Sequence, residues 1–383
     1  MVEEFEQAIV DQVKRFAREV LLPQAERIDR EELFVTRHQA ALGDLGAMGM
    51  NLPETWGGLG LSGSALYQAV EAIAAVCGST ASMLTAHFLA TDSVLIGGNE
   101  DQRAEILPLA ASGKYLGAFA LTEPGAGSNP AEMSTRARRE GDGYRITGQK
   151  CFISNAAAAD FIVVYAKSNP DAGARGISAY LIRPSEHAGV EISSHEKTMG
   201  LRGGHVFTVS LDCFVPASCL LGDEGQGFRT AMKVLDNGRI EVAAQATGIA
   251  GAALEAAIDY AKTRFVGGHP IADLQGLQWM LADSATELAA ARGLGLNAAR
   301  LRERRERFSV EASMAKLYAS EAAWRIADRA LQIHGGYGYT RAFPLERYLR
   351  DLRIFRIYEG SSEIQRNIIA RTILNDGYRR PTS

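Results

Sequence analysis

The 383-residue sequence is poor in the residues that build metal sites and disulfide frameworks. It has four cysteines and seven histidines, with no CxxC spacing and no paired histidines near a cysteine. This predicts reduced thiols and no metal site. The net charge is only −4, and the arginine-rich run 302–307 is interrupted by Glu303 and Glu306. The charge pattern therefore gives no electrostatic basis for nucleic-acid binding.

Long apolar runs are also missing. No uninterrupted apolar segment reaches the roughly 18 residues that a membrane-spanning helix needs, so no membrane insertion is expected. Residues 1–5 are acidic and lack the basic-then-apolar order of a signal peptide. Together with the reduced thiols, this predicts a cytoplasmic protein. The chain is 46% apolar and 22% charged, which is typical of a globular protein with a large core.

The period of the apolar residues predicts an N-terminal helical domain over residues 1–115. Phe5, Ile9 and Val13 begin a series with a spacing of three or four residues. This series predicts a helix that stops around Pro23. Further helices are expected to begin near 36 and to cover 64–77, 81–96 and 101–111.

The period then changes to that of strands. Short segments rich in β-branched and aromatic residues lie at 144–147, 161–165, 177–182 and 206–215, separated by turn residues. No helical segment stands between them. The pattern therefore predicts a central antiparallel β domain over residues 116–226 and excludes βαβ units.

From residue 227 to residue 383 the pattern is helical again and rich in alanine. Helices are expected over 231–263, 275–300, 309–334 and 361–374. Alanine and glycine on contact faces allow close packing, and the short link 267–270 favours antiparallel neighbours. A C-terminal four-helix bundle is therefore predicted, which makes the fold class α+β and mainly α.

One stretch near the C-terminus combines the residues of an acid–base site. In Tyr358-Glu359-Gly360-Ser361-Ser362, a carboxylate precedes a glycine and two hydroxyls. Glycine permits close backbone approach to a flat ligand, and the following amides and hydroxyls could bind an anion. A carboxylate desolvated by such a ligand would have a raised pKa and act as a base near neutral pH. The alternative is a helix N-terminus with a capping box completed by Glu363.

A second candidate segment, 119–129, opens the β domain. Its glycines and its hydroxyl residues Thr122 and Ser128 allow the backbone to lie against a ligand. Gly125 and Gly127 could suggest a dinucleotide fingerprint. However, Pro130 stands where the third glycine belongs and no helix is predicted to follow, so a Rossmann site is excluded. An ordinary surface loop remains the alternative.

Four further residues have both a structural and a functional interpretation. Phe152 and Ser154 would share one face of a strand and suit a planar heterocycle, although a half-buried strand needs no ligand. Arg239 lies in an alanine-rich helix, where Asp236 three residues earlier could pair with it. Arg264 could bind a phosphate or stabilise the C-terminus of the same helix.

Taken together and in this order, these motifs make the sequence similar to the acyl-CoA dehydrogenases, flavoproteins that desaturate acyl-CoA thioesters at the α,β position. The resemblance covers essentially the whole chain. The motifs that support it lie at 121–128, 199–203, 222–228, 237–239, 334–339 and 357–360.

The resemblance implies FAD bound between the β domain and the bundle, in a homotetramer (a dimer of dimers) whose subunits share each cofactor. The central-domain positions that match FAD contacts are Phe119, Leu121, Thr122, Gly127, Ser128, Phe152, Ile153 and Ser154. Positions that would reach the FAD of a neighbouring subunit are Arg264, Gln275, Gln332, Gly335 and Gly336. Positions that would hold phosphate or adenosine groups are Gly360, Ser361 and Ser362.

The resemblance also implies the chemistry. Glu359 matches the family's catalytic base, and acyl-CoA contacts match Ser128, Asp236, Arg239, Tyr358, Gly360 and Arg371. Some members place the base at the position of Gly238, where glycine leaves Glu359 as the candidate. Glu359 would remove the α-proton while FAD takes a hydride from the β-carbon, with the enolate oxygen bound by amide and ribityl donors. Electrons would then pass to an electron-transferring flavoprotein.

The sequence departs from the family pattern at several positions. Phe152 replaces a usual tryptophan and Ser154 a usual threonine, but an aromatic ring and a hydroxyl are kept. The segment 264–268 lacks the usual phenylalanine before its second glycine, and Asn129 replaces an aspartate.

The substrate is constrained only in part. Thr80 occupies the position of an arginine in the glutaryl-CoA branch, which argues against a dicarboxylyl substrate. The bulky residues of 81–90 favour a short or branched acyl chain, and an acyl group carried on a protein stays open. An oxidase or monooxygenase on the same scaffold, or a non-catalytic scaffold, are the alternative functions. The retained Tyr358 and Glu359, and the lack of the extra C-terminal domain of large acyl-CoA oxidases, argue against the first.

Overall fold

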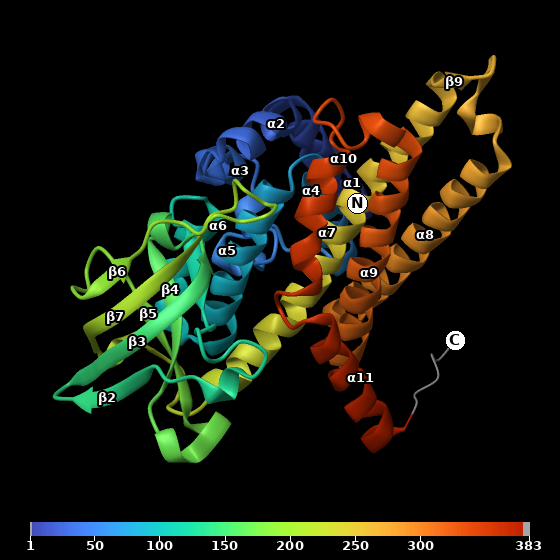
Figure 1. Cartoon of the computed structure of the whole chain (residues 1–383). Coiled ribbons are helices and arrows are strands. Elements are labelled where there is room, and N and C mark those ends of the chain that lie inside the picture. The colour runs from blue at the N-terminus through green and yellow to red at the C-terminus, as the bar shows by residue number, and fades with distance from the viewer. Residues whose placement is uncertain (1, 378–383) are drawn as a thin grey trace.

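The computed structural model describes residues 2–377, and its elements follow the order helices, sheet, helices (Figure 1). This confirms the mainly helical α+β fold expected from the change of period along the chain. The predicted C-terminal domain extends to residue 383, and its last six residues lie outside the described part. None of the described helices is long and apolar enough to cross a bilayer.

The first helix does not stop around Pro23, and that prediction is wrong. Helix α1 (Val2–Phe16) continues through a π-helical turn, Ala17–Leu21, into α2 (Leu22–Glu31). In this turn the amide of Leu22 donates to the carbonyl of Ala17, five residues earlier. Pro23 then lies in the first turn of α2, where its missing N–H is tolerated.

The other N-terminal helices lie close to the predicted ranges. They are α3 (Gln39–Asp44), α4 (Gly63–Val76), α5 (Gly78–Gly97) and α6 (Glu100–Ala111). Every residue of α5 from Gly78 to Val94 is buried, polar ones included. Helix α5 therefore lies inside the protein, between the sheet and the C-terminal helices (Figure 1).

The β domain contains one eight-stranded sheet in the order β6-β7-β3-β2-β4-β5-β8, with β1 joined to β4. Its strands are β1 (Gly117–Ala120), β2 (Arg136–Glu140), β3 (Gly143–Ser154), β4 (Phe161–Lys167), β5 (Ile177–Ile182), β6 (Val190–Ile192), β7 (Val206–Pro216) and β8 (Leu220–Leu221). Most pairs are antiparallel, as expected. The exceptions are β1 with β4 and one register position of β2 with β4, which are parallel. A β2–β3 hairpin connects β1 to β4, so the lack of a helix between strands did not exclude parallel pairing.

The C-terminal region contains α7 (Gly227–Thr263), α8 (Gln275–Glu303), α9 (Ser309–His334), α10 (Leu345–Leu352) and α11 (Ser362–Asp376). Helices α7, α8 and α9 pack against one another, and α10 and α11 pack on α9. The short helix α10 was not predicted. A two-stranded hairpin, β9 (Phe265–Val266) and β10 (His269–Pro270), links α7 to α8.

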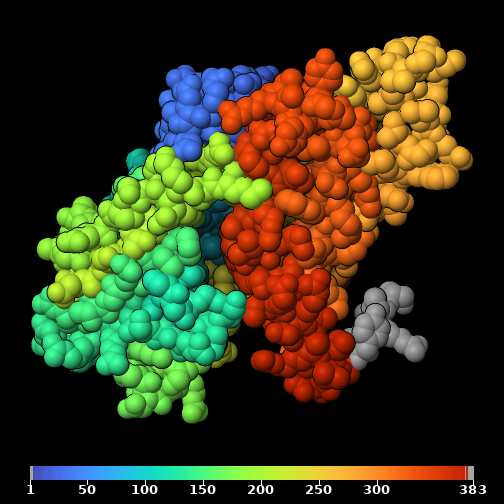
Figure 2. All heavy atoms as spheres, in the orientation of Figure 1, coloured from blue at the N-terminus to red at the C-terminus, as the bar shows by residue number. Residues whose placement is uncertain are grey.

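The two helical regions share one hydrophobic core. Buried residues of α1, α4 and α5 belong to the same cluster as those of α7, α8 and α9. Gly248 of α7 allows this close approach, since a Cβ there would collide with the backbone of Glu71 in α4. Helix α7 also contacts β5, so it connects the bundle to the sheet. A groove lies between the β domain and the C-terminal helices (Figure 2).

Candidate active site

Residues 357–361 form a tight turn between α10 and α11, on the side of the bundle that faces the β domain (Figure 1). Glu359 and Gly360 both have positive φ, of 53° and 91°. Ser361 caps α11, since its side chain accepts from the amide of Ile364 at 3.4 Å. The helix-cap interpretation is therefore confirmed, but no capping box forms because Glu363 is the second residue of the helix. The cap and the display of Glu359 are compatible features of one turn.

Two buried side chains hold this turn through hydrogen bonds to its carbonyl groups. Lys316 of α9 donates through Nζ to the carbonyl of Gly360 at 2.7 Å. Gln365 of α11 donates through Nε2 to the carbonyls of Glu359 at 3.1 Å and Gly360 at 2.9 Å. Both side chains are fully buried. These bonds fix the backbone that positions the Glu359 carboxyl group.

The carboxyl group of Glu359 packs directly on Gly238 of α7. A Cβ at residue 238 would collide with Glu359 Oε2 and with the side chain of Leu89 on α5. The residue as a whole is partly exposed, but Oε2 is buried without a hydrogen-bond partner among residues 2–377. Burial raises the pKa of Glu359 to about 7, although Lys316 and Arg239 act in the opposite direction. A carboxylate of this kind is a suitable general base near neutral pH.

The predicted pairing within α7 is present. Arg239 forms an ion pair with Asp236, which also accepts from the Ser309 hydroxyl. Arg239 is 5% exposed and its Nε has no partner in the described part of the chain. Further along the helix, Gln245 donates to Thr85, but its Oε1 is likewise unpartnered within residues 2–377.

The predicted flavin-binding segments lie next to each other in the sheet. The loop after β1 is tied to β3, because the amide of Cys151 donates to the carbonyl of Thr122 at 3.0 Å. Within β3 the register shifts between Lys150 and Ile153, and Phe152 at this bulge has a φ of 57° and is 65% exposed.

The neighbouring candidates divide into buried and accessible positions. Leu121 and Ile153 face the core, and Phe119 packs half-buried against Tyr165. The positions accessible from outside are Thr122, Gly127, Ser128 and Ser154.

This residue set fits a flavin chemically. It offers an exposed aromatic ring, that of Phe152, and several accessible hydroxyls. At the N-terminus of α11, Ser362 Oγ is buried without a partner among the described residues, close to Gly360 and Ser361. A helix N-terminus with a free hydroxyl is suited to a phosphate or an adenosine group.

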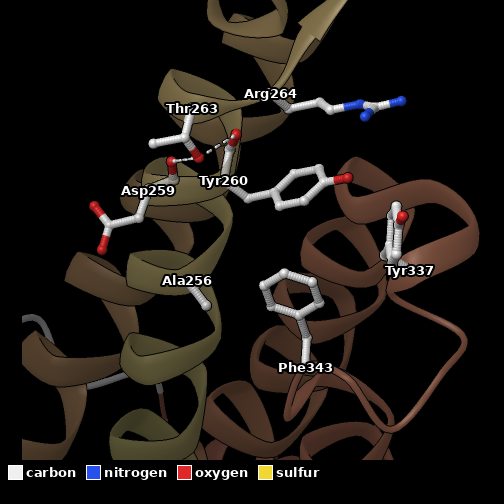
Figure 3. Close-up of a pocket in the computed structure, with 7 residues that line it drawn as sticks. All are labelled: Ala256, Asp259, Tyr260, Thr263, Arg264, Tyr337 and Phe343. Atoms are coloured by element: carbon white, nitrogen blue, oxygen red, sulfur yellow. Dashed lines mark hydrogen bonds between the residues drawn. The ribbon is translucent and has the colours of Figure 1, made fainter.

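A second set of candidates lies elsewhere, at the ends of α7 and α9. Arg264, Gln332, Gly335 and Gly336 line an open hollow of about 600 Å³. Figure 3 shows the adjoining surface, where Arg264, Tyr260 and Tyr337 surround a second hollow of about 420 Å³. Gln275 is exposed at the start of α8 and lines neither hollow.

Arg371 stands apart from the other candidates. It is exposed on α11, nine residues beyond the start of that helix, and is not among the residues that line either hollow. The structure of the single chain therefore gives no contact that joins it to Glu359.

Sequence reasoning missed several residues that form the site. Lys316 and Gln365 were not singled out, although a lysine within the alanine-rich stripe of α9 is a signal for a buried charge. The ion pair of Lys150 with Glu123, at 2.8 Å and almost fully buried, was missed as well. So was Glu241 of α7, whose carboxyl oxygens have no hydrogen-bond partner in the described residues.

The sequence analysis also made predictions about the thiols and about a metal site. Cys77, Cys151, Cys213 and Cys219 are free thiols. Within residues 2–377, no group of three or more metal-ligating side chains could hold a metal ion.

The helix–sheet–helix fold, the desolvated carboxyl group of Glu359 and the flavin-compatible residues of the β domain are those of a flavin-dependent oxidoreductase. Three family models match the chain. They describe the N-terminal domain of acyl-CoA dehydrogenase at residues 3–114, its middle domain at 118–213 and its C-terminal domain at 225–374. The chain belongs to the acyl-CoA dehydrogenase family, whose members are FAD-dependent.

Individual proteins agree with this assignment. The chain is 42% identical to an acyl-CoA dehydrogenase of Bacillus subtilis, covering 94% of this chain and 96% of that protein. It is 41% identical to the human mitochondrial short-chain specific acyl-CoA dehydrogenase, over 97% and 90% of the two chains.

Solved structures are similar over their whole length. The butyryl-CoA dehydrogenase of Megasphaera elsdenii has a TM-score of 0.94 at 35% identity, covering 97% of this chain and 98% of that one. A chain solved in work on the electron transferring flavoprotein of Acidaminococcus fermentans has a TM-score of 0.95 at 39% identity, with the same coverage.

Proposed function

We propose that this protein oxidises a short or branched acyl-CoA thioester to the 2-enoyl-CoA, with Glu359 as the base. The observation that supports this most strongly is the carboxyl group of Glu359. It is seated on Gly238, is desolvated at Oε2, and is held by a turn whose carbonyls accept three hydrogen bonds from Lys316 and Gln365. A desolvated carboxylate in a fixed position is what removal of a weakly acidic α-proton requires.

In the proposed reaction, Glu359 takes the α-proton of the thioester and keeps it on its carboxyl group. FAD, when bound, supplies the two-electron acceptor for the hydride that leaves the β-carbon. The backbone amide of Glu359 would donate to the thioester oxygen and stabilise the charge that develops there. Substrate in the groove would exclude the remaining water and raise the pKa of Glu359 further.

Acyl-CoA binding is assigned to the matching positions in four segments of the chain. Ser128 follows β1, Asp236 and Arg239 lie on α7, and Tyr358 and Gly360 flank the base. Arg371 would contact the CoA part from α11. The carboxylate of Asp236 already balances the charge of the Arg239 guanidinium. We therefore expect Arg239 to orient the substrate rather than to attract it by charge.

The acyl chain is proposed to be short. Met83, Leu84 and Phe88 of α5 are buried, and the side chain of Leu89 on the same helix lies against Gly238, as does the carboxyl group of Glu359. We infer from the bulk of this helix that a short acyl chain fits near Glu359 better than a long one. The names of the similar proteins, short-chain specific acyl-CoA dehydrogenase and butyryl-CoA dehydrogenase, support the same conclusion.

The electron acceptor and the assembly belong to this proposal. We infer an electron-transferring flavoprotein as the acceptor, supported by the similarity to the chain from the Acidaminococcus fermentans work. We also infer a cytoplasmic homotetramer, in which Arg264, Gln275, Gln332, Gly335 and Gly336 contact the FAD of a neighbouring subunit. The accessible hollow at Arg264 and Gln332 in the single chain supports such a contact.

The test is a set of anaerobic titrations of the purified yellow protein with acyl-CoA thioesters. Butyryl-CoA and isobutyryl-CoA should bleach the flavin, whereas hexadecanoyl-CoA and glutaryl-CoA should not. Rapid oxygen consumption during turnover would instead identify an oxidase. A colourless protein would contradict the enzymatic function.

A further inference from the structure

Lys316 is a buried cation whose surroundings offer little to balance its charge. Its side chain is fully buried on α9, on the same helix face as Ala312, Ala315 and Ala319. Its Nζ donates to the carbonyl of Gly360 at 2.7 Å. No carboxylate lies within ion-pair distance of Nζ in the described part of the chain. Burying an ammonium group without a charged partner is costly, so a specific reason for this charge is expected.

The hydrogen bond that Lys316 donates to the turn does not by itself require a positive charge. Gln365 already donates to the carbonyls of both Glu359 and Gly360. A neutral donor from α9 would complete the same set of hydrogen bonds. What lysine adds to the turn is therefore its positive charge, one residue away from Glu359.

Few other charged groups face Glu359 from the helices packed against it. From α7, the site is faced by Arg239 and by the acidic Glu241, and Arg239 is paired with Asp236. From α9 it is faced by Lys316 alone. Lys316 itself also interacts more weakly with Arg239, with Glu321 of α9 and with Glu363 of α11.

We infer that Lys316 is a positioning residue that keeps Glu359 ionised and oriented for removal of the substrate α-proton. This inference rests on the proposed role of Glu359 as the base. Burial lowers the pKa of Lys316 to about 8, while Glu359 acts to raise it. The pKa of Glu359 is raised by burial to about 7. Both groups are therefore charged together in the interval between these values.

The experiment compares four variants of the FAD-loaded enzyme. Lys316→Met removes the charge and the donor, Lys316→Gln removes the charge and keeps a donor, and Lys316→Arg keeps the charge. Gln365→Leu is the matched control, because it removes two turn hydrogen bonds and no charge. The rate of flavin bleaching by butyryl-CoA is measured from pH 5.5 to pH 9.5.

We expect the acidic limb of the profile to move upward by about one pH unit or more in Lys316→Met and Lys316→Gln. It should stay in place in Lys316→Arg and Gln365→Leu, even where the maximal rate falls. Infrared titration gives a readout apart from activity. The band of a protonated carboxyl group that disappears in Glu359→Gln should persist to higher pH in both neutral Lys316 variants.

Two results would overturn the inference. One is an unchanged acidic limb and infrared band in both neutral variants. The other is an equal shift in Gln365→Leu, which would assign the effect to the shape of the turn. If Lys316→Met does not fold, Lys316→Gln decides. The inference and the proposed function fail separately. If the flavin of the Glu359→Gln variant is still bleached by butyryl-CoA, the role of Glu359 as the base is contradicted, whatever the Lys316 variants show.

Discussion

Glu359 and Phe152 share a backbone conformation that few non-glycine residues adopt. Their φ angles are 53° and 57°, and each stands at an irregularity, a tight turn and a bulge. Such conformations cost about 1–3 kcal/mol and persist where the surroundings enforce them. The sequence could identify both residues as candidates, since it shows the residue types of the motifs and their order along the chain. Their backbone angles depend on Lys316, Gln365 and β7, which the local sequence pattern does not reveal.

At the residue scale, Gly238 is the most informative position to change. The methyl group of Gly238→Ala would collide with Glu359 Oε2 and Leu89. A displacement of the base by about 1 Å should lower flavin reduction by about a hundredfold. Stopped-flow reduction by butyryl-CoA measures this.

The control for this prediction is Gly293→Ala on α8, where an added Cβ meets nothing within 4 Å. It should leave the rate unchanged and stabilise the helix by up to about 1 kcal/mol. A Gly238→Ala enzyme with the wild-type rate would show that Glu359 is not seated on this glycine in the working enzyme.

Glu241 gives a second prediction at this scale, on stability. Burial raises its pKa well above the ordinary value, and the nearby Asp92 raises it further. The folded protein then holds a proton that the unfolded chain loses above pH of about 4.5, so stability falls as pH rises. Glu241→Gln removes this loss. Its stability relative to wild type should grow between pH 5 and pH 8, by roughly 1.4 kcal/mol for each pH unit over which the folded protein keeps this proton.

Urea unfolding at the two pH values measures the effect. The exposed Glu54, changed to Gln, serves as the control for the loss of one carboxyl group. A Glu241→Gln variant that is less stable than wild type at pH 8 would mean that this carboxyl group is ionised and paired with Arg302, whose Nη1 lies 3.8 Å away.

At the scale of elements, the loop that follows β1 depends on a buried ion pair. Lys150 of β3 donates to Glu123 at 2.8 Å and to the carbonyl of Leu121 at 3.0 Å. Glu123 also accepts from the amides of Ser134 and Thr135. Burial alone would raise the pKa of Glu123, but Lys150 and these donors lower it to about 2. The loop that carries Thr122 and Ser128 is therefore fixed to the sheet.

Glu123→Gln should destabilise the protein by about 3–5 kcal/mol, because it leaves Lys150 buried without a counter-charge. The loop should loosen and FAD should be released more readily. Thermal unfolding and FAD retention after gel filtration measure both effects. Since the folded pKa is depressed, the stabilisation by Glu123 should be present above pH of about 4.5 and fade as pH falls toward about 2. Equal stability of variant and wild type at pH 7 would contradict the anchoring role.

The elements also show what sequence patterns can determine. The spacing of apolar residues located nearly every long helix and the main strands, because burial of one face imposes this spacing along the whole element. It failed at Pro23, where a π-helical turn shifts the hydrogen bonds and lets the helix continue. It also missed α10 and β1, which are too short for a period to develop. The parallel pairing of β1 depends on topology, which local sequence does not encode.

At the scale of the whole molecule, the N-terminal and C-terminal helices form one core around α7 and α4. The candidate site residues lie on this core and on the β domain, and Leu89 of α5 adds a contact from the N-terminal region. The exposed set at Arg264, Gln332, Gly335 and Gly336 lies apart from Glu359, on a different end of the bundle. In the proposed assembly these residues contact the FAD of a neighbouring subunit, which would account for their separation from Glu359.

Sedimentation equilibrium should accordingly give a mass four times that of one chain. Arg264→Ala should weaken FAD binding by about tenfold, because it removes a charge-assisted contact, without altering the acidic limb of the rate profile. Arg353→Ala, a change away from the hollow, is the matched control. A monomer that retains FAD at full affinity would contradict the shared-cofactor assembly.

The central claim, that Glu359 removes the α-proton, is tested most directly by anaerobic stopped-flow reduction of the flavin in wild type and Glu359→Gln. The variant should retain FAD and bind butyryl-CoA, while flavin reduction should fall by at least about a hundredfold. Reduction within a few-fold of the wild-type rate, at full FAD content, would contradict the assignment of Glu359 as the base.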